Sequence, residues 1–415
     1  MISASEQSHV LRRAMDYGLL SDTDTTVAFY FSHVLNEKLD EVNAHFKGHD
    51  TLHAVAVKTN PVKGVLDEIV RVGHGLEAAS IIEVKMALAA GCPVNKVIFD
   101  SPAKTRKEIS WCMDNLEGAH VNANCLEELY RYPIRSGLNL GLRINVQQSS
   151  GSDAFLDVSG EVSKFGEPID NEDEIVKAAK QYAELNTLHI HQGSQNRNVE
   201  KLLRGIERVI DLAHAMNKAL GKNQITTLNI GGGFAVNYSQ GQPWRIEELY
   251  KPLERLLAEK GRDFKIITEL GRFYHAHSGF TASRCEYVMQ RGNTQVAVLH
   301  AGADLFLREC YVPEARVTTF RVFSPAFDLK NGNEVNTHLA GPLCFGGDFT
   351  ARDISLPKIE EGDYVVFNDS GANSLALWSM HCSRAAPAVL LYDKHTGRIE
   401  RIKDRQKDED VMRFW

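Results

Sequence analysis

HAVAVKTNP, residues 53–61, is the first clear member of a pattern that recurs along this chain. Its small and branched apolar residues are typical of a buried strand, and the run ends in a lysine and a turn. Because side chains alternate along a strand, we expect Ala54, Ala56 and Lys58 to share one face. The two alanines leave room around the amine of Lys58, which suits Schiff-base formation with a carbonyl cofactor. For this run alone, a strand-end lysine that reaches into water is the simpler explanation.

Seven further runs of this kind follow, and stretches with helical periodicity lie between them. Two of these stretches end at Gly91 and Gly221, the residue type expected just past a helix. Eight strand–helix units in a row favour a closed parallel (β/α)8 barrel, the TIM-barrel class of α/β fold, over an open sheet. The runs begin at His53, Gly75, Lys96, His120, Asn139, Thr187, Thr227 and Lys265.

The pattern changes beyond about Ser278. Runs such as QVAVLHAG, DYVVFND and PAVLLYD are separated by turns, with few helical stretches between them. This texture predicts a mainly antiparallel β-domain. We therefore expect a barrel over residues 26–277 and a β-domain formed by residues 1–25 together with residues 278–415.

The totals exclude several classes of protein. A chain of 415 residues with 43% hydrophobic and 24% charged residues is long enough for two domains and has the composition of a soluble globular protein. A net charge of −7 gives no reason to expect nucleic acid or an anionic membrane as a partner. The seven cysteines show neither metal-binding pairs nor a disulfide framework, so we expect a reducing cytoplasm. We also expect no signal peptide, no membrane span and no metal site.

Polar residues stand at the carboxyl ends of the predicted barrel strands, where barrel enzymes collect their functional groups. They are Lys58, Glu77, Asn145, His191, Gly231 to Gly233, and Glu269 with Arg272. The glycines of IGGGF (230–234) let backbone N–H groups approach an oxyanion, and a helix starting behind them favours phosphate, although a tight turn explains them as well. Arg272 can grip a phosphate through two parallel hydrogen bonds or form a surface salt bridge.

Two of these groups suit a flat heteroaromatic cofactor. His191, in HIHQGSQ (189–195), shares a strand face with His189 and can lie flat on a ring, or it is a core histidine. Ser194 follows at the next turn and can donate to a phosphate. Glu269 ends an apolar strand, where an ionised carboxylate needs a partner, either a pyridinium N–H or a basic side chain. A protonated pyridine ring is the electron sink that carbanion formation at Cα requires.

At this point the chain resembles a known family, the fold-type III pyridoxal-phosphate decarboxylases that include the diaminopimelate, ornithine and arginine decarboxylases. The resemblance covers nearly the whole chain, with the motifs in the family's order. They are AVKTNP (56–61), LRINV (142–146), SKFG (163–166), HIHQGSQ (189–195), NIGGGF (229–234), ELGR (269–272), LFLRECY (305–311), GPLCFGGD (341–348) and SGAN (370–373).

The resemblance implies a role for each matching residue. Lys58 looks like the Schiff-base lysine, His191 like the residue stacked on the cofactor ring, and Glu269 like the carboxylate on the pyridine nitrogen. Ser194, Gly232, Gly233, Gly271, Arg272 and Asn373 look like the phosphate site. Cys344 looks like the acid that returns a proton to Cα, supplied by the partner subunit of a homodimer whose active sites lie at the dimer interface. Arg308, Tyr311, Phe345 and Asp348 look like substrate-site residues.

The chain also departs from the family pattern. Phe345 stands where the family has a carboxylate that recognises the distal ammonium of the substrate, and Asp348 lies three residues further on. Asn373 stands in place of a tyrosine that usually helps to hold the phosphate. ELGR replaces EPGR, and the segment of Arg308 and Tyr311 is one residue shorter than usual.

From Phe345 we expect decarboxylation of an L-amino acid, or of a conjugate, whose distal end is not a free ammonium, for example a citryl-amino acid of siderophore biosynthesis. Lys104, Arg106 and Lys107 could serve an anionic distal end, or they form a solvated loop. Three alternatives remain open: a diaminopimelate decarboxylase of lysine biosynthesis, a catalytically silent homologue that binds pyridoxal phosphate, and an amino-acid racemase. Glu269 favours decarboxylation over racemisation.

Overall fold

A computed structural model describes residues 2–149, 156–238, 246–315 and 318–415 of the chain. The chain divides into two compact units. The barrel unit comprises Leu39–Asn237 and Gln242–Phe273, and the β unit comprises Met1–Lys38, Tyr238–Gly241 and Tyr274–Trp415. No helix in the described part of the chain combines the length and the apolar character needed to cross a bilayer.

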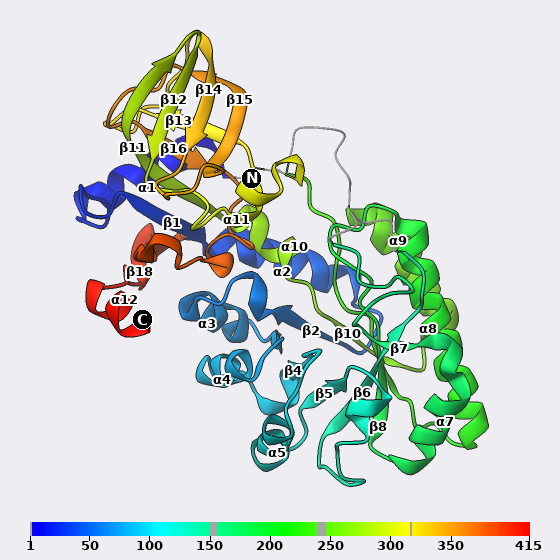
Figure 1. Ribbon diagram of the computed structural model, residues 1–415. Helices are drawn as coiled ribbons and strands as arrows, with labels where there is room; N and C mark the ends of the chain where they lie inside the picture. The colour runs from blue at the N-terminus through cyan, green and yellow to red at the C-terminus, as the bar shows by residue number, and fades with distance from the viewer. Residues whose placement is uncertain (1, 150–155, 239–245, 316–317) are drawn as a thin grey trace. The chain divides into compact units, whose positions relative to one another are not determined.

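Eight parallel strands form the wall of the barrel unit (Figure 1). Their order is β5-β4-β3-β2-β10-β9-β8-β6, and pairing of β6 with β5 closes the ring. A two-residue strand, β7 (Glu167–Pro168), extends the sheet from β6. The closed parallel barrel confirms the fold predicted from the repeated runs. The strands are β2 (Thr51–Ala56), β3 (Gly75–Ala78), β4 (Val97–Phe99), β5 (His120–Ala123), β6 (Asn139–Asn145), β8 (Leu185–His189), β9 (Thr227–Asn229) and β10 (Lys265–Thr268).

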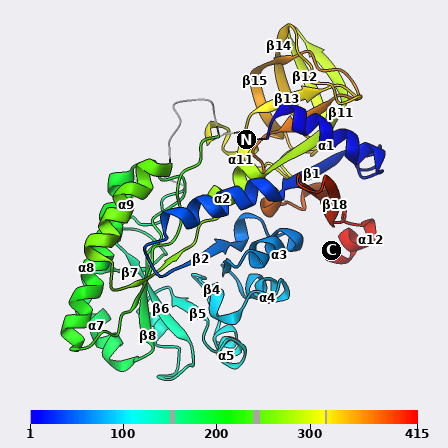
Figure 2. The ribbon, with the colours of Figure 1, turned by 180° about the vertical axis from the view of Figure 1, so that it is seen from behind.

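Helices alternate with the strands and pack outside the barrel, as the view from behind shows for α7, α8 and α9 (Figure 2). Gly221 caps the long helix α8 in the left-handed conformation, with φ +65°, and Gly91 follows α4 with φ +81°. Both glycines are the helix ends predicted from the sequence. The helices are α2 (Ser32–His45), α3 (Lys63–Arg71), α4 (Ile81–Ala89), α5 (Arg106–Asn115), α6 (Leu126–Leu129), α7 (Glu172–Gln181), α8 (Val199–Leu220), α9 (Ile246–Lys260) and α10 (Arg272–His275).

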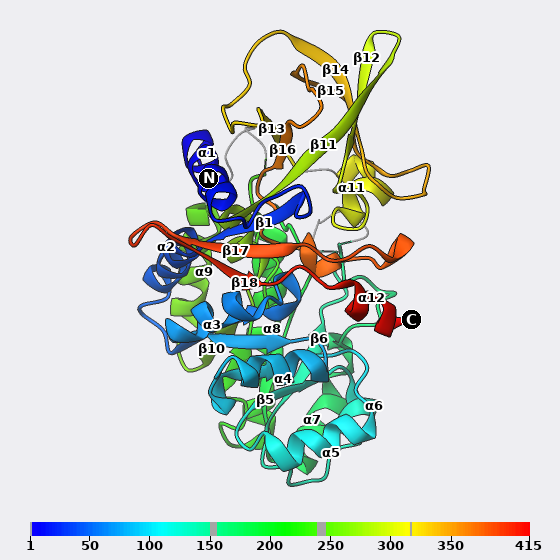
Figure 3. The same ribbon diagram turned by 90° about the vertical axis from the view of Figure 1, so that its left-hand side faces the viewer.

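The β unit is built on a mainly antiparallel sheet of order β15-β14-β12-β11-β1-β17-β18, with β16 and β13 joined at β11 (Figure 3). This sheet confirms the predicted mainly antiparallel β architecture. The predicted boundary at residue 26 assigned β1 to the barrel, but β1 pairs with β11 and β17. The strands are β1 (Thr26–Phe31), β11 (Gly279–Arg291), β12 (Thr294–Leu299), β13 (Phe320–Phe323), β14 (Glu334–Ala340), β15 (Phe349–Pro357), β16 (Tyr364–Phe367), β17 (Ala388–Asp393) and β18 (Arg398–Lys403); the helices are α1 (Ala4–Asp16), α11 (Leu307–Tyr311) and α12 (Asp408–Phe414).

Aromatic side chains dominate the core of the β unit. Phe29 stacks on Phe280 with ring centroids 4.7 Å apart, and Phe306 stacks on Phe367 at 4.2 Å. All four rings are buried, and such side chains contribute most to core stability because each removes a large apolar area from water. This core fixes the strands from which the loops of the unit start.

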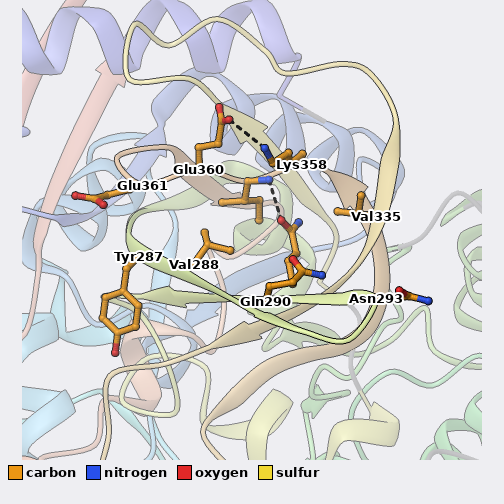
Figure 4. A pocket seen from close by; sticks show the side chains of 10 residues that line it. Tyr287, Val288, Gln290, Asn293, Val335, Lys358, Glu360 and Glu361 are labelled. Atoms are coloured by element: carbon orange, nitrogen blue, oxygen red, sulfur yellow. Dashed lines mark hydrogen bonds and ion pairs between the residues drawn. The ribbon is translucent and has the colours of Figure 1, made fainter.

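A hollow of about 380 Å³ opens on the β unit, between the β11–β12 hairpin and the segment after β15 (Figure 4). A hydrogen bond joins two of its lining residues: Oε1 of Gln295 accepts from the backbone N–H of Ile359 at 3.2 Å. Lys358 and Glu360 form an ion pair of 3.5 Å at its edge. None of the site residues predicted from the sequence lines this hollow.

Candidate active site

Lys58 lies just beyond the end of strand β2. The strand stops at Ala56, and residues Val57–Thr59 form a single 3-10 turn that the Thr59 hydroxyl closes by donating to the Ala56 carbonyl at 2.6 Å. The prediction that Lys58 continues the strand alternation of Ala54 and Ala56 is therefore wrong. The turn instead directs the amine to the end of the neighbouring strand β3, where Nζ donates to both carboxylate oxygens of Glu77 at 2.8 and 3.0 Å.

The Lys58–Glu77 pair holds a proton near neutral pH. Burial by itself disfavours the charged amine, but attraction to Glu77 and Glu269 outweighs it and raises the pKa of Lys58. Burial raises the pKa of Glu77 to about 7, against the attraction of Lys58 and with repulsion from Glu269 and Asp100. Because 47% of the Lys58 side chain is exposed, solvent moderates the attraction. The two groups titrate as a pair.

A cluster of buried polar side chains lies inside the barrel, on the strand ends near Lys58. Glu269, directly after β10, is 5% exposed and accepts a hydrogen bond of 2.6 Å from the Asn229 amide. His189, at the end of β8, places Nε2 3.3 Å from Glu269 and Nδ1 3.5 Å from Asp100. Arg143 on β6 pairs with Asp100 at 3.5 Å.

Sequence reasoning assigned no site role to Asp100, His189, Arg143 or Asn229. Each of them is a polar residue at or near the carboxyl end of a predicted strand, and that position is the sequence signal from which they could have been found. Glu77 is among the strand-end residues of the sequence analysis, but without a role. Asn145, recognised with it, ends β6 and donates from its amide to the carbonyl of Gly160 at 3.1 Å.

His191 is held as a neutral ring. Its Nδ1 accepts a hydrogen bond of 3.2 Å from the backbone N–H of Gly232. Burial, together with the positive charges of Arg143 and Lys58, holds the pKa of His191 well below its ordinary value. A neutral imidazole oriented through one nitrogen is suited to lie against a flat aromatic ring.

The glycine loop after β9 has no room for side chains. A Cβ on Gly232 would lie 2.4 Å from the carbonyl oxygen of Glu269, and one on Gly233 would lie 2.0 Å from that of Gly193. Gly231 and Gly233 have φ of +65° and +90°, which favours glycine. The predicted helix does not follow the glycines directly: the described residues 234–238 are not helical, and α9 begins at Ile246.

Two further predicted residues of the barrel unit have defined positions. Ser194 is half-buried, and its backbone N–H donates to the Leu156 carbonyl at 3.2 Å. Arg272 is the first residue of α10 and follows Gly271. A Cβ on Gly271 would lie 2.5 Å from the Thr59 side chain. Gly271 thus packs against the turn that carries Lys58.

Lys104 does not serve a ligand. It is 2% exposed, and its Nζ donates to the carbonyls of Ser101 and Asn122 and to the Glu128 carboxylate at 2.7 to 2.9 Å. Neither alternative left open for Lys104, a contact to an anionic substrate or a place in a solvated loop, fits this position, since its three donors bond to protein groups near the strand ends. Arg106 and Lys107 are exposed on the first turn of α5.

The other predicted residues belong to the β unit. Tyr311 and Phe345 stack with ring centroids 4.9 Å apart and an interplanar angle of 15°, and Tyr311 remains 58% exposed. Cys344 is exposed, and its backbone N–H donates to the sulfur of Cys382 at 3.4 Å. Asn373 has φ +56°, a conformation that asparagine tolerates. Arg308 lies on α11.

Asp348 is turned into its own loop. It is 3% exposed, and its two oxygens accept from the backbone N–H groups of Ala303 and Leu343, each at 2.6 Å. Its backbone carbonyl also accepts from Gly341 at 2.8 Å. The sequence predicts that this carboxylate contacts the substrate. Both of its oxygens already accept hydrogen bonds that hold the loop from Gly341 to Asp348, which conflicts with that prediction.

A family model described as "Pyridoxal-dependent decarboxylase, pyridoxal binding domain" matches residues 33–276, over half of the chain. The chain belongs to the pyridoxal-dependent decarboxylases. The match confirms the family inferred from the motifs, with pyridoxal phosphate as the cofactor and amino-acid decarboxylation as the reaction class. A silent homologue and a racemase are thereby set aside.

Known relatives resemble this decarboxylase over most of its length. The diaminopimelate decarboxylase of Pseudomonas aeruginosa is 28% identical over 371 residues, which cover 87% of this chain and 86% of the relative. The crystal structure of diaminopimelate decarboxylase from Helicobacter pylori complexed with L-lysine gives a TM-score of 0.86 at 24% identity, covering 96% of this chain and 98% of that one. Lysine/ornithine decarboxylase complexed with cadaverine from Vibrio vulnificus gives 0.80 at 21% identity, covering 94% and 99%. These two structures show the shared fold.

The residues of the barrel unit fit pyridoxal phosphate. Lys58 supplies an amine, Glu269 a buried carboxylate, and His191 a neutral ring. The loop from Gly231 to Gly233 packs its backbone directly against the carbonyl groups of Ile190, Glu269 and Gly193, and it has no side chains to shield its N–H groups from a phosphate.

Proposed function

We propose that this decarboxylase carries pyridoxal phosphate on Lys58 in the barrel unit. The convergence of the Lys58 amine, the Glu77 carboxylate and the buried Glu269 carboxylate supports this most directly. Bound pyridoxal phosphate supplies an electron sink for the pair left on Cα when carbon dioxide departs. The proposed cofactor site comprises Lys58, His191, Ser194, Gly232, Gly233, Glu269, Gly271, Arg272 and Asn373.

Anionic, neutral and cationic residues have different roles toward the cofactor. Glu269 accepts a hydrogen bond from the ring nitrogen and keeps it protonated, while the neutral His191 covers one ring face. Arg272, Ser194 and the glycine loop neutralise and orient the phosphate. Glu77 holds the Lys58 side chain in place as an ammonium, which must lose its proton before the amine can react with a carbonyl.

Diaminopimelate is the first substrate we propose. The support is the similarity to diaminopimelate decarboxylases over 86% or more of both lengths for the Pseudomonas aeruginosa protein. This favours the alternative considered in the sequence analysis over a citryl-amino acid, for which none of the relatives described above gives support.

The aromatic pair of Tyr311 and Phe345 favours a second candidate, an amino acid whose distal end carries no ammonium. Phe345 offers an ammonium only a cation–π contact, and the nearby Asp348 carboxylate is already bonded to two backbone N–H groups. We propose that Arg308 contacts the substrate together with Tyr311 and Phe345.

Carbon dioxide release tests both candidates. Purified enzyme supplied with pyridoxal phosphate is offered diaminopimelate, lysine, ornithine, arginine and a citryl-amino acid, with Lys58→Ala as the blank. Turnover of diaminopimelate at least tenfold above the others supports the first candidate. Preference for the citryl-amino acid supports the second, and release that persists in Lys58→Ala contradicts the proposed cofactor lysine.

We further propose a homodimer in which Cys344 of one subunit donates a proton to Cα at the site of the other. Lys58→Ala and Cys344→Ala proteins, each inactive or nearly so, should regain activity when they are mixed and allowed to exchange subunits. If mixing restores no activity although mass measurement shows exchanged dimers, the shared site is wrong.

Cytoplasmic location stays a proposal, which the seven free thiols support.

A further inference from the structure

A histidine stands between two carboxylates inside the barrel. His189, at the end of β8, has no exposed surface, and its two ring nitrogens face different acids: Nδ1 lies 3.5 Å from Asp100 and Nε2 lies 3.3 Å from Glu269. The three side chains come from the ends of three strands, β4, β8 and β10. The imidazole fills the space between the carboxylates.

Each carboxylate also has a partner on its far side. Asp100 pairs with Arg143 at 3.5 Å, and the Oε1 of Glu269 accepts from the Asn229 amide at 2.6 Å. Burial opposes ionisation of Asp100, but His189, Arg143, Lys104 and Lys58 outweigh it and hold the pKa of this carboxyl below its ordinary range. Both acids are therefore fixed in position with one side turned to His189.

Ion pairs surround the imidazole. Glu77 pairs with Lys58 at 2.8 Å, and Asp100 pairs with Arg143 at 3.5 Å. Lys104 pairs with Glu128 at 2.9 Å. The two carboxylates that face His189 therefore belong to a larger set of buried charged groups with fixed partners.

We propose that His189 is a positioning residue: its imidazole fills the space between Asp100 and Glu269 and thereby keeps the Glu269 carboxylate oriented toward the pyridine nitrogen. This rests on the proposed role of Glu269 at that nitrogen. The Asn229 amide holds one oxygen of Glu269, and the imidazole lies 3.3 Å from the other. Asp100, paired with Arg143, lies against the opposite nitrogen and limits rotation of the ring.

Kinetics separate positioning from mere packing. His189→Gln should lower kcat on the order of tenfold with little change in KM, and should change the cofactor absorbance in the same direction as Glu269→Gln. The double variant should be no slower than Glu269→Gln alone, since both changes act on one carboxylate. His120→Gln, which replaces another buried barrel histidine outside the cluster, is the matched control and should keep wild-type kcat.

The outcomes distinguish two failures. If Glu269→Gln keeps full activity, the proposed role of Glu269 is wrong whatever His189 does. If Glu269→Gln is slow but His189→Gln is as fast as wild type, or if the two effects simply multiply in the double variant, His189 does not act through Glu269.

Discussion

At the scale of single residues, the Lys58–Glu77 pair sets the chemistry available before any ligand arrives. An amine that a neighbouring carboxylate keeps in its protonated form is not a nucleophile, so the ion pair that holds Lys58 in place also lowers its reactivity. The raised pKa of Glu77, about 7, brings that restraint into the range of neutral pH. Loading of the cofactor should therefore depend on pH in a way that one substitution alters.

We expect Glu77→Gln to speed the uptake of pyridoxal phosphate by apo-protein at pH 7 by a few-fold. Without the Glu77 carboxylate, less attraction opposes the effect of burial, although Glu269 and Asp100 remain, so the pKa of Lys58 falls and more free amine is present. The cofactor absorbance followed after mixing gives the rate. Glu172→Gln, on the exposed first turn of α7, is the control, and equal rates for Glu77→Gln and wild type would contradict this role.

Phe345 is the residue at which substrate preference should change most. Phe345→Glu should raise kcat/KM on ornithine or lysine about tenfold, because it supplies the ionised acceptor that the locked Asp348 cannot provide. Phe345→Leu removes the ring without adding charge and should give no such gain. A gain of equal size in both variants would point to lost bulk as the cause.

At the scale of elements, the positions of strands followed from the sequence, but their ends did not. All eight barrel strands lie within the predicted runs or overlap them, since alternation of branched residues and glycine caps are local signals. The 3-10 turn at Lys58 has no such signal, because HAVAVK continues the strand pattern through Val57. The His189 contacts to Asp100 and Glu269 depend on strand order around a closed ring, which no local pattern contains.

The glycine loop offers a test of an element. Gly233→Ala should weaken pyridoxal phosphate binding at least tenfold, because the new Cβ would meet the Gly193 carbonyl and force the loop to move. Gly91→Ala is matched to it: φ is +81°, but nothing lies within 4 Å of the new Cβ. It should lose about 1 kcal/mol of stability and bind the cofactor normally, as equilibrium titration would show. Equal affinities in both variants would exclude the loop from the phosphate site.

At the scale of the whole molecule, buried histidines make stability sensitive to acid. Burial lowers the pKa of His53 and of His275 to about 3, and that of His74 and of His120 to about 4. Their contribution to stability is complete above the unfolded pKa near 6.5 and is lost as pH falls toward the folded values. Glu77 acts in the opposite sense between pH 7 and 4.5, but it is one group against four.

The free energy of unfolding should therefore fall from pH 6.5 to pH 4, by up to about 1.4 kcal/mol per pH unit for each histidine. Urea titration at a series of pH values measures this slope. His120→Gln should reduce the slope by the share of one histidine, whereas His395→Gln, which replaces an exposed residue, should leave it unchanged. A slope that is the same in all three proteins would refute the assignment.

The closure of the loop from Gly341 to Asp348 has a consequence for protein engineering. Its shape is fixed by the hydrogen bond from the Gly341 N–H to the Asp348 carbonyl and by the two hydrogen bonds that the Asp348 carboxylate accepts. None of these hydrogen bonds involves the side chain at position 345. Substitution at position 345 therefore keeps these hydrogen bonds, although it changes the packing of the side chain against Tyr311 and the cluster of Ala303, Cys310 and Leu343. A library of variants at this position, with Asp348 kept constant, would sample new substrate preferences on the same hydrogen-bonded loop.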